Sequence, residues 1–111
     1  MKTIWSEKVD EVLKIGRCLE SIGIKNWALE KKEALCVLRQ FLDLGIPVLG
    51  GDVYVEKNNT IESTYDSWHC DLALAESQLE FIIRSNVVAR NYIETYLVDT
   101  NPVLFALVPK I

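Results

Sequence analysis

The sequence predicts an α+β domain in which a small antiparallel sheet of about three strands is packed with three helices, in the order α-α-β-β-α-β. Three observations support this fold class. Apolar residues recur at three- and four-residue steps before Gly45 and after Glu76, as on one face of a helix. Between residues 48 and 68 they alternate instead, as in strands. Residues 103–109, VLFALVP, form a continuous apolar run, which is typical of a central strand buried on both faces.

The elements follow from these periods and from the residues that begin and end them. Ser6 is suited to cap the first helix and Asn26 the second, because both side chains accept a backbone N–H. Gly23 is placed to end the first helix, and Gly45 and Pro47 end the second. The expected bounds are 6–22, 27–44 and 76–96 for the helices, and 48–56, 61–68 and 103–108 for the strands.

Length and composition bound the class of protein. With 111 residues, half of them apolar, the chain is expected to form one domain, 1–111, with a hydrophobic core. No apolar run has the length of a membrane span, and the first eleven residues contain acids rather than a signal peptide's apolar region. The odd set of Cys18, Cys36 and Cys70 has no metal or redox spacing. These features predict a cytoplasmic protein with reduced thiols.

The hairpin register is predicted from the faces that carry apolar residues. A two-residue turn at positions 58–59 pairs Val55 with Glu62 and places an acid on the apolar side. An odd loop of about three or five residues avoids this clash of patterns. We therefore expect four side chains to be buried together, namely Val53, Val55, Ile61 and Tyr65.

The same register predicts an acidic sheet face that also carries two aromatic side chains. Aromatic residues often anchor protein interfaces, and carboxylates pair with Arg or Lys of a partner. The alternative role of the two aromatics is to cover the sheet in the core. The candidate partner-binding residues are Asp52, Tyr54, Glu56, Glu62, Asp66 and Trp68.

Charge is concentrated in the same region. Residues 50–80 contain seven acids and one base, a net charge of −6, while the rest of the chain carries +2, which gives the total of −4. An acidic centre repels nucleic acid and favours a basic protein partner. The other interpretation is a solvated face that keeps the domain soluble.

Other chemistry finds little support in the sequence. Gly50 and Gly51 open the hairpin, but no Lys, Ser or helix start follows them as a phosphate-binding loop needs. The adjacent His69 and Cys70, with Asp66 nearby, resemble a nucleophile and base. Neighbouring residues of a strand point to opposite faces, however, so the two side chains are not expected to meet. We expect no catalytic residue, metal site or cofactor.

A family resemblance gives these features a function. GGDVY at residues 50–54, YDSW at residues 65–68, the helical segment FIIRSNVVARNYIETY and the final apolar strand together resemble the Imm40 immunity protein family of bacterial polymorphic toxin systems. The resemblance implies a small cytoplasmic α+β protein, encoded beside a toxin, that binds and blocks the toxin domain without being an enzyme. It supplies no catalytic residues to carry over.

Charge and resemblance together predict the partner. A nuclease toxin presents basic residues to its substrate, so an acidic inhibitor could occupy that surface. The expected partner is a cognate toxin domain, with no nucleic acid or membrane, and the chain is expected to be a monomer or weak homodimer. The alternative function is a non-enzymatic adaptor or regulatory protein-binding domain.

Overall fold

The computed structural model describes residues 3–98 and 100–111. Within them the chain forms three α-helices, one short 3-10 helix (η1) and five strands. In chain order these elements are α1 (Glu7–Leu13), β1 (Arg17–Cys18), η1 (Glu20–Ile22), β2 (Trp27–Glu30), α2 (Lys31–Leu44), β3 (Val48–Lys57), β4 (Thr60–His69), α3 (Gln78–Thr95) and β5 (Val103–Pro109).

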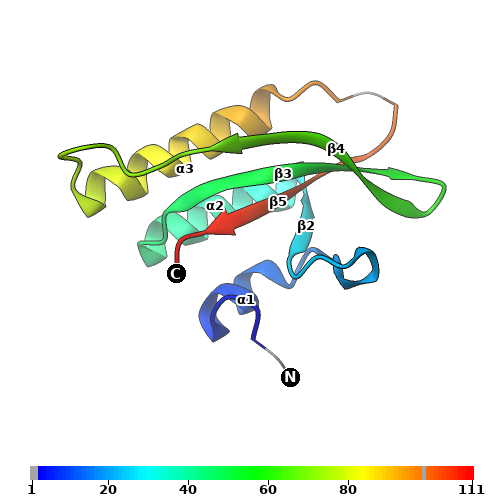
Figure 1. The fold of residues 1–111 in the computed structure, drawn as a ribbon, viewed down its shortest axis with the longest axis horizontal. Helices are drawn as coiled ribbons and strands as arrows, with labels where there is room; N and C mark the ends of the chain where they lie inside the picture. The colour runs from blue at the N-terminus through cyan, green and yellow to red at the C-terminus, as the bar shows by residue number, and fades with distance from the viewer. Residues whose placement is uncertain (1–2, 99) are drawn as a thin grey trace.

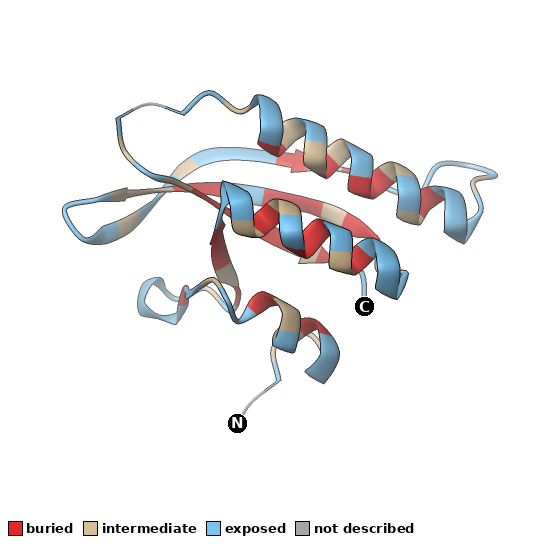
Figure 2. Ribbon diagram, turned by 180° about the vertical axis from the view of Figure 1, so that it is seen from behind, coloured by how far each residue is buried: buried red, intermediate tan, exposed pale blue. Residues whose placement is uncertain are grey.

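The five strands make one antiparallel sheet in the order β1-β2-β5-β3-β4, and α2 and α3 both lie against one of its faces (Figures 1 and 2). The α+β class is confirmed, and so are the strands expected at 48–56, 61–68 and 103–108. β5 occupies the centre of the sheet, as its continuous apolar run predicted. The two edges of the sheet are β1, which is two residues long, and β4, which is ten residues long.

The core lies mainly between the sheet and the two helices. Its buried side chains from the sheet include Leu29, Val53, Phe105 and Leu107. The helices supply Val37, Leu38, Phe41, Ala89 and Ile93. A second, smaller cluster lies on the other face, where the segment around η1 covers part of the sheet; it consists of Leu19, Ala28, Tyr54, Leu104 and Ala106.

The first helix is much shorter than the expected span of 6–22. The Ser6 hydroxyl caps it as predicted, but the helix ends before Gly16. A Cβ at Gly16 would lie 2.6 Å from the Ala28 carbonyl oxygen, so the chain there passes directly against β2. Leu19 continued the helical period in the sequence, yet it is buried in the second cluster on the other face of the sheet. Its spacing therefore reflects burial in a separate core, not the same helix.

The second helix begins four residues later than expected, because residues 27–30 form β2 instead. Asn26 does not cap a helix; it is buried, and its side-chain nitrogen donates to the Leu107 carbonyl oxygen at 2.9 Å. Glu30 caps α2 in a capping box with Glu33, whose carboxylate accepts the Glu30 N–H at 2.9 Å. The sheet thus has five strands rather than about three, and the predicted element order is wrong.

The third helix is confirmed, with Gln78–Thr95 observed against 76–96 expected. Ser77 and Glu80 form its capping box. Ser85 is buried on the face toward the sheet, and its hydroxyl accepts the Val48 N–H at 3.0 Å. This contact places α3 against the beginning of β3, and α3 then runs beneath the hairpin.

Candidate functional site

The β3–β4 hairpin closes through Asn58 and Asn59, whose φ angles are 51° and 65°. Two central residues with positive φ make a type I′ turn, which suits the twist of paired strands and which asparagine tolerates. The turn pairs Val55 with Glu62. The odd loop predicted from the alternation of apolar residues is therefore wrong, because turn chemistry rather than alternation sets the register at this end.

The even register separates the four acids that were expected on one face. Residues directly opposite each other on paired strands project from the same face. Glu62 lies opposite Val55, and Trp68 lies opposite Gly51, so both share the face against which α2 and α3 pack. Asp52 follows Gly51 directly in β3, so its side chain projects from the opposite face, which α2 and α3 do not cover and which is called the open face below.

On the open face, the expected binding residues have different surroundings. Asp52 is exposed, whereas Tyr54 is only 4% exposed and belongs to the second core cluster. Burial raises the pKa of the Tyr54 hydroxyl, and the Asp52 carboxylate raises it further. Glu56 is ion-paired with Arg17 of β1. Asp52 is thus the exposed acid of this face, while Tyr54 and Glu56 hold the hairpin to the remainder of the sheet.

The other three expected residues lie between β4 and α3. The Asp66 carboxylate accepts a hydrogen bond from the Tyr96 hydroxyl at 2.6 Å, and this bond is the main reason that the pKa of Tyr96 is raised. Trp68 is only 7% exposed, and its ring stacks on Tyr92 with centroids 4.6 Å apart. Glu62 is exposed and stands at a groove of about 310 Å³. Asp66 and Trp68 therefore fasten the edge strand to α3.

A bulge in β4 exposes a residue that the sequence reasoning missed. Between the pairs Asp52–Ser67 and Tyr54–Ser63, β4 contains three residues where β3 contains one. At the apex, Tyr65 has a φ of 67° and is 92% exposed. The prediction that it is buried beside the apolar face of β3 is wrong.

One signal in the sequence could have revealed this bulge. Continued without interruption, the register set by the asparagine turn would place residue 66 opposite Gly51. A tryptophan ring packs well over a glycine, and Trp68 lies two residues further along β4. Bringing Trp68 onto Gly51 therefore requires two extra residues in β4, and those residues form the bulge.

The glycine pair serves close packing. Gly50 has a φ of 152°, and a Cβ there would lie 2.1 Å from the Trp68 carbonyl oxygen. At Gly51 a Cβ would lie 2.2 Å from the Trp68 ring and 2.7 Å from the Ala106 carbonyl oxygen. Both residues lie inside β3 rather than in a loop before a helix. The structure thus agrees with a close approach of backbone and ring, not with a phosphate cradle.

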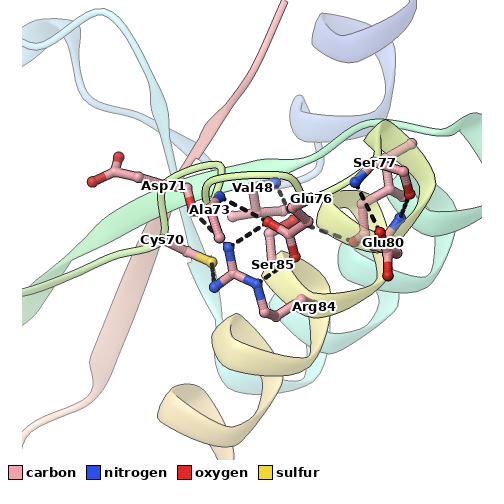
Figure 3. A network of polar contacts seen from close by, with 10 residues as sticks. Val48, Cys70, Asp71, Ala73, Glu76, Ser77, Glu80, Arg84 and Ser85 are labelled. Atoms are coloured by element: carbon pink, nitrogen blue, oxygen red, sulfur yellow. Dashed lines mark hydrogen bonds and ion pairs between the residues drawn. The ribbon is translucent and has the colours of Figure 1, made fainter.

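The loop after β4 is held by a network centred on Arg84 of α3 (Figure 3). The guanidinium donates to both Glu76 carboxylate oxygens at 2.7 and 2.8 Å, and to the Asp71 carbonyl oxygen at 2.6 Å. Its third nitrogen lies 3.2 Å from the sulfur of Cys70, which is buried. His69 is exposed. Cys70 therefore contacts Arg84 and belongs to this network, not to a nucleophile and base pair.

This network predicts a pH dependence of stability. Hydrogen bonds from Arg84 and from the Ala73 N–H lower the pKa of Glu76 from 4.5 to about 2. A depressed carboxylate pKa stabilises the fold above pH 4.5, and the contribution is lost as the pH falls toward about 2. Urea unfolding should thus show a stability gap between wild type and Glu76→Gln that narrows from pH 6 to pH 2. A gap that stays constant over this range would contradict the assignment.

The class of protein can now be defined. β4 is an edge strand that carries the exposed Tyr65 with carboxylates nearby. Such a surface is suited to a protein partner. Within residues 3–98 and 100–111, no three His, Cys, Asp or Glu side chains gather as metal ligands, and no helix is long and apolar enough to cross a membrane.

The model of the family Immunity protein 40 matches residues 18–109. The chain belongs to this family and is an immunity protein, whose partner is a toxin protein. No curated protein and no solved structure gave a significant match.

Proposed function

We propose that this immunity protein binds its cognate toxin domain directly and neutralises it through an acidic surface on the β3–β4 hairpin. The observation that carries the proposal is the family match over residues 18–109. We propose that it acts in the cytoplasm as a monomer or weak homodimer, with no catalytic role and no affinity for nucleic acid or membrane. Inhibition then requires only occupation of the toxin's working surface.

The charge distribution supports a basic target. Residues 58–83 contain five acids and no Lys or Arg. A toxin that acts on nucleic acid needs basic residues around its active site, because its substrate is a polyanion. Complementary charge raises the rate at which two such proteins meet. A nuclease is therefore the class of toxin that this surface suits best.

The geometry narrows the residues that can touch the partner. The exposed carboxylates of the hairpin are those of Asp52, Glu62 and Asp66. Glu56 is engaged by Arg17, and Tyr54 and Trp68 are packed inside. Asp52, Glu62 and Asp66 are proposed as contact residues, Asp66 through the carboxylate oxygen that does not accept the Tyr96 hydroxyl. The other three are proposed to hold the hairpin in shape.

A charge-reversal pair tests the acidic surface. Asp52→Lys combined with Glu62→Lys changes the net charge from −4 to 0 and should slow association with the toxin domain several-fold at low salt. The fold should be retained, since exposed substitutions usually change stability by less than about 0.5 kcal/mol. The effect should shrink in salt, because the Debye length falls from about 30 Å at 0.01 M to about 10 Å at 0.1 M. Stopped-flow association measured at both ionic strengths gives the result.

The matched control is Glu11→Lys combined with Asp43→Lys, which produces the same net charge. These two acids line a groove between α1 and α2, and none of the residues that line this groove belongs to the hairpin. The control should retain more of the association rate than the hairpin pair. Equal slowing in both double variants would show that only net charge matters and would remove the hairpin as the contact surface.

A further inference from the structure

We infer that the β4 bulge is the anchor of the toxin contact: the exposed Tyr65 ring packs on a basic side chain of the toxin, whose charge is accepted by Glu62 and Asp66. This inference rests on the proposed function, and it names the contact surface and the chemistry that the toxin must present there. The partner surface is a protein surface that carries Arg or Lys.

The first support is that Tyr65 is exposed, whereas every other aromatic ring is buried or partly buried. Of the ten aromatic side chains in the sequence, Tyr65 alone is exposed, at 92%. Tyrosine is among the residues that most often dominate binding energy at protein interfaces. Its ring also stacks on arginine and attracts ammonium groups. An isolated exposed tyrosine on an edge strand is therefore suited to a basic partner.

The second support is that the ring is presented by a strained backbone. A positive φ is unfavourable for a bulky residue, and here it is stabilised by side chains on either side. The Ser63 hydroxyl accepts the Tyr65 N–H at 3.0 Å, and the Thr64 hydroxyl accepts the Asp66 N–H at 3.1 Å. The Thr64 hydroxyl also donates to the Val53 carbonyl oxygen at 2.9 Å. A conformation fixed in this way before binding loses little entropy on binding.

The third support is the groove that adjoins the bulge. It holds about 310 Å³, and its walls include Val55, Val103 and Leu97 with Glu62 among them. Lys57 also lines it. An Arg or Lys side chain has an aliphatic stem and a charged end. The three apolar side chains suit the stem and the Glu62 carboxylate suits the charged end, while the remainder of the lining is mainly polar.

The edge geometry favours this mode over the addition of a second strand. Among residues 3–98 and 100–111, β4 pairs with β3 alone, so β4 is an edge strand of the sheet. The bulge between Ser63 and Ser67 interrupts that edge in its middle, and such interruptions hinder continuous pairing with another chain. Side-chain docking at the bulge is therefore favoured over strand pairing with a second copy of this chain.

Tyr65→Gly tests the anchor without disturbing the fold. Glycine adopts a φ of 67° without strain, so the thermal midpoint should equal or exceed that of wild type. The dissociation constant for the toxin domain encoded beside the gene should rise at least about tenfold, as for other interface anchors. Tyr65→Phe, which keeps the ring, should bind within about threefold of wild type. If Tyr65→Gly proves unfolded, Tyr65→Asn provides the same test, because asparagine also tolerates this conformation.

The control is Leu74→Ala, which truncates another fully exposed apolar side chain, in the loop before α3. It should leave the dissociation constant unchanged. Wild-type affinity in folded Tyr65→Gly would overturn the inference, as would a larger loss in Leu74→Ala. A wild-type dimer that light scattering shows to become monomeric in Tyr65→Gly would also overturn it, since a second copy would then cover the edge. If wild type itself fails to bind the toxin domain, the proposed function fails instead.

Discussion

Gly50→Ala is expected to lower the free energy of unfolding by about 3 kcal/mol or more, from the combined cost of backbone strain and overpacking. The φ of 152° is one that residues with a Cβ rarely adopt. The added Cβ would also lie 2.1 Å from the carbonyl oxygen and 3.1 Å from the carbonyl carbon of Trp68. These are backbone atoms of β4, so relief requires the two strands of the hairpin to separate. Chemical denaturation of the purified variant measures the loss.

Gly23→Ala separates the two causes. Gly23 also has a positive φ, of 80°, but a Cβ there meets nothing within 4 Å. Its replacement should cost only the conformational term, about 1 kcal/mol. Equal losses in the two variants would show that the close approach of β3 and β4 contributes nothing.

Trp68→Ala is expected to destabilise the protein by about 3–5 kcal/mol, as is usual for a large aromatic removed from a core. Its ring stacks on Tyr92. The Tyr92 ring contacts that of Tyr96 at a centroid distance of 5.8 Å, and the Tyr96 ring contacts that of Phe105 at 5.7 Å. Removing the first ring leaves a cavity beneath β4. Urea unfolding, followed by far-UV circular dichroism, measures the change.

Trp68→Phe is the companion variant and should cost much less. It keeps a ring against Tyr92 and removes the indole N–H, which is buried without a hydrogen-bond partner among the described residues. If Trp68→Ala instead keeps wild-type stability and loses only toxin binding, then Trp68 is a contact residue, as its sequence motif first suggested.

The long elements were predictable because their patterns extend over many residues. α3 displays five turns of apolar period, and the strands β3, β4 and β5 are each at least seven residues long. Over such lengths helical and alternating periods separate clearly. The central position of β5 also followed from its sequence, because only a strand covered on both faces is apolar at every position.

The short elements and the register were not predictable from periodicity. β2 has four residues, too few to distinguish the two periods, and it is followed directly by a helix. Leu19 falls at a helical step after the apolar residues of α1, but it belongs to the second core cluster and not to the helix. The alternation of apolar residues favoured a loop with an odd number of residues, whereas Asn58 and Asn59 form a two-residue turn.

The candidate site was predicted in part. The sequence reasoning placed a site on the hairpin, which stays a prediction, and it assigned anchor roles to Tyr54 and Trp68, which are packed. It missed Tyr65, because the two extra residues of the bulge keep the alternation of faces along β4 and leave no mark in it, while they take Tyr65 out of pairing with β3. Composition also cannot distinguish an acid that is free from one, such as Glu56, that a distant arginine engages.

Neutralisation is measured most directly by expressing a candidate cognate toxin domain in bacteria, with and without this chain, and by purifying the complex under native conditions. Growth should be restored when both are expressed, and the two chains should co-elute as a stable complex that dissociates more readily at high salt. Persistent growth arrest in the presence of a folded, well-expressed chain would contradict the proposed function. Restored growth without any complex would contradict direct binding.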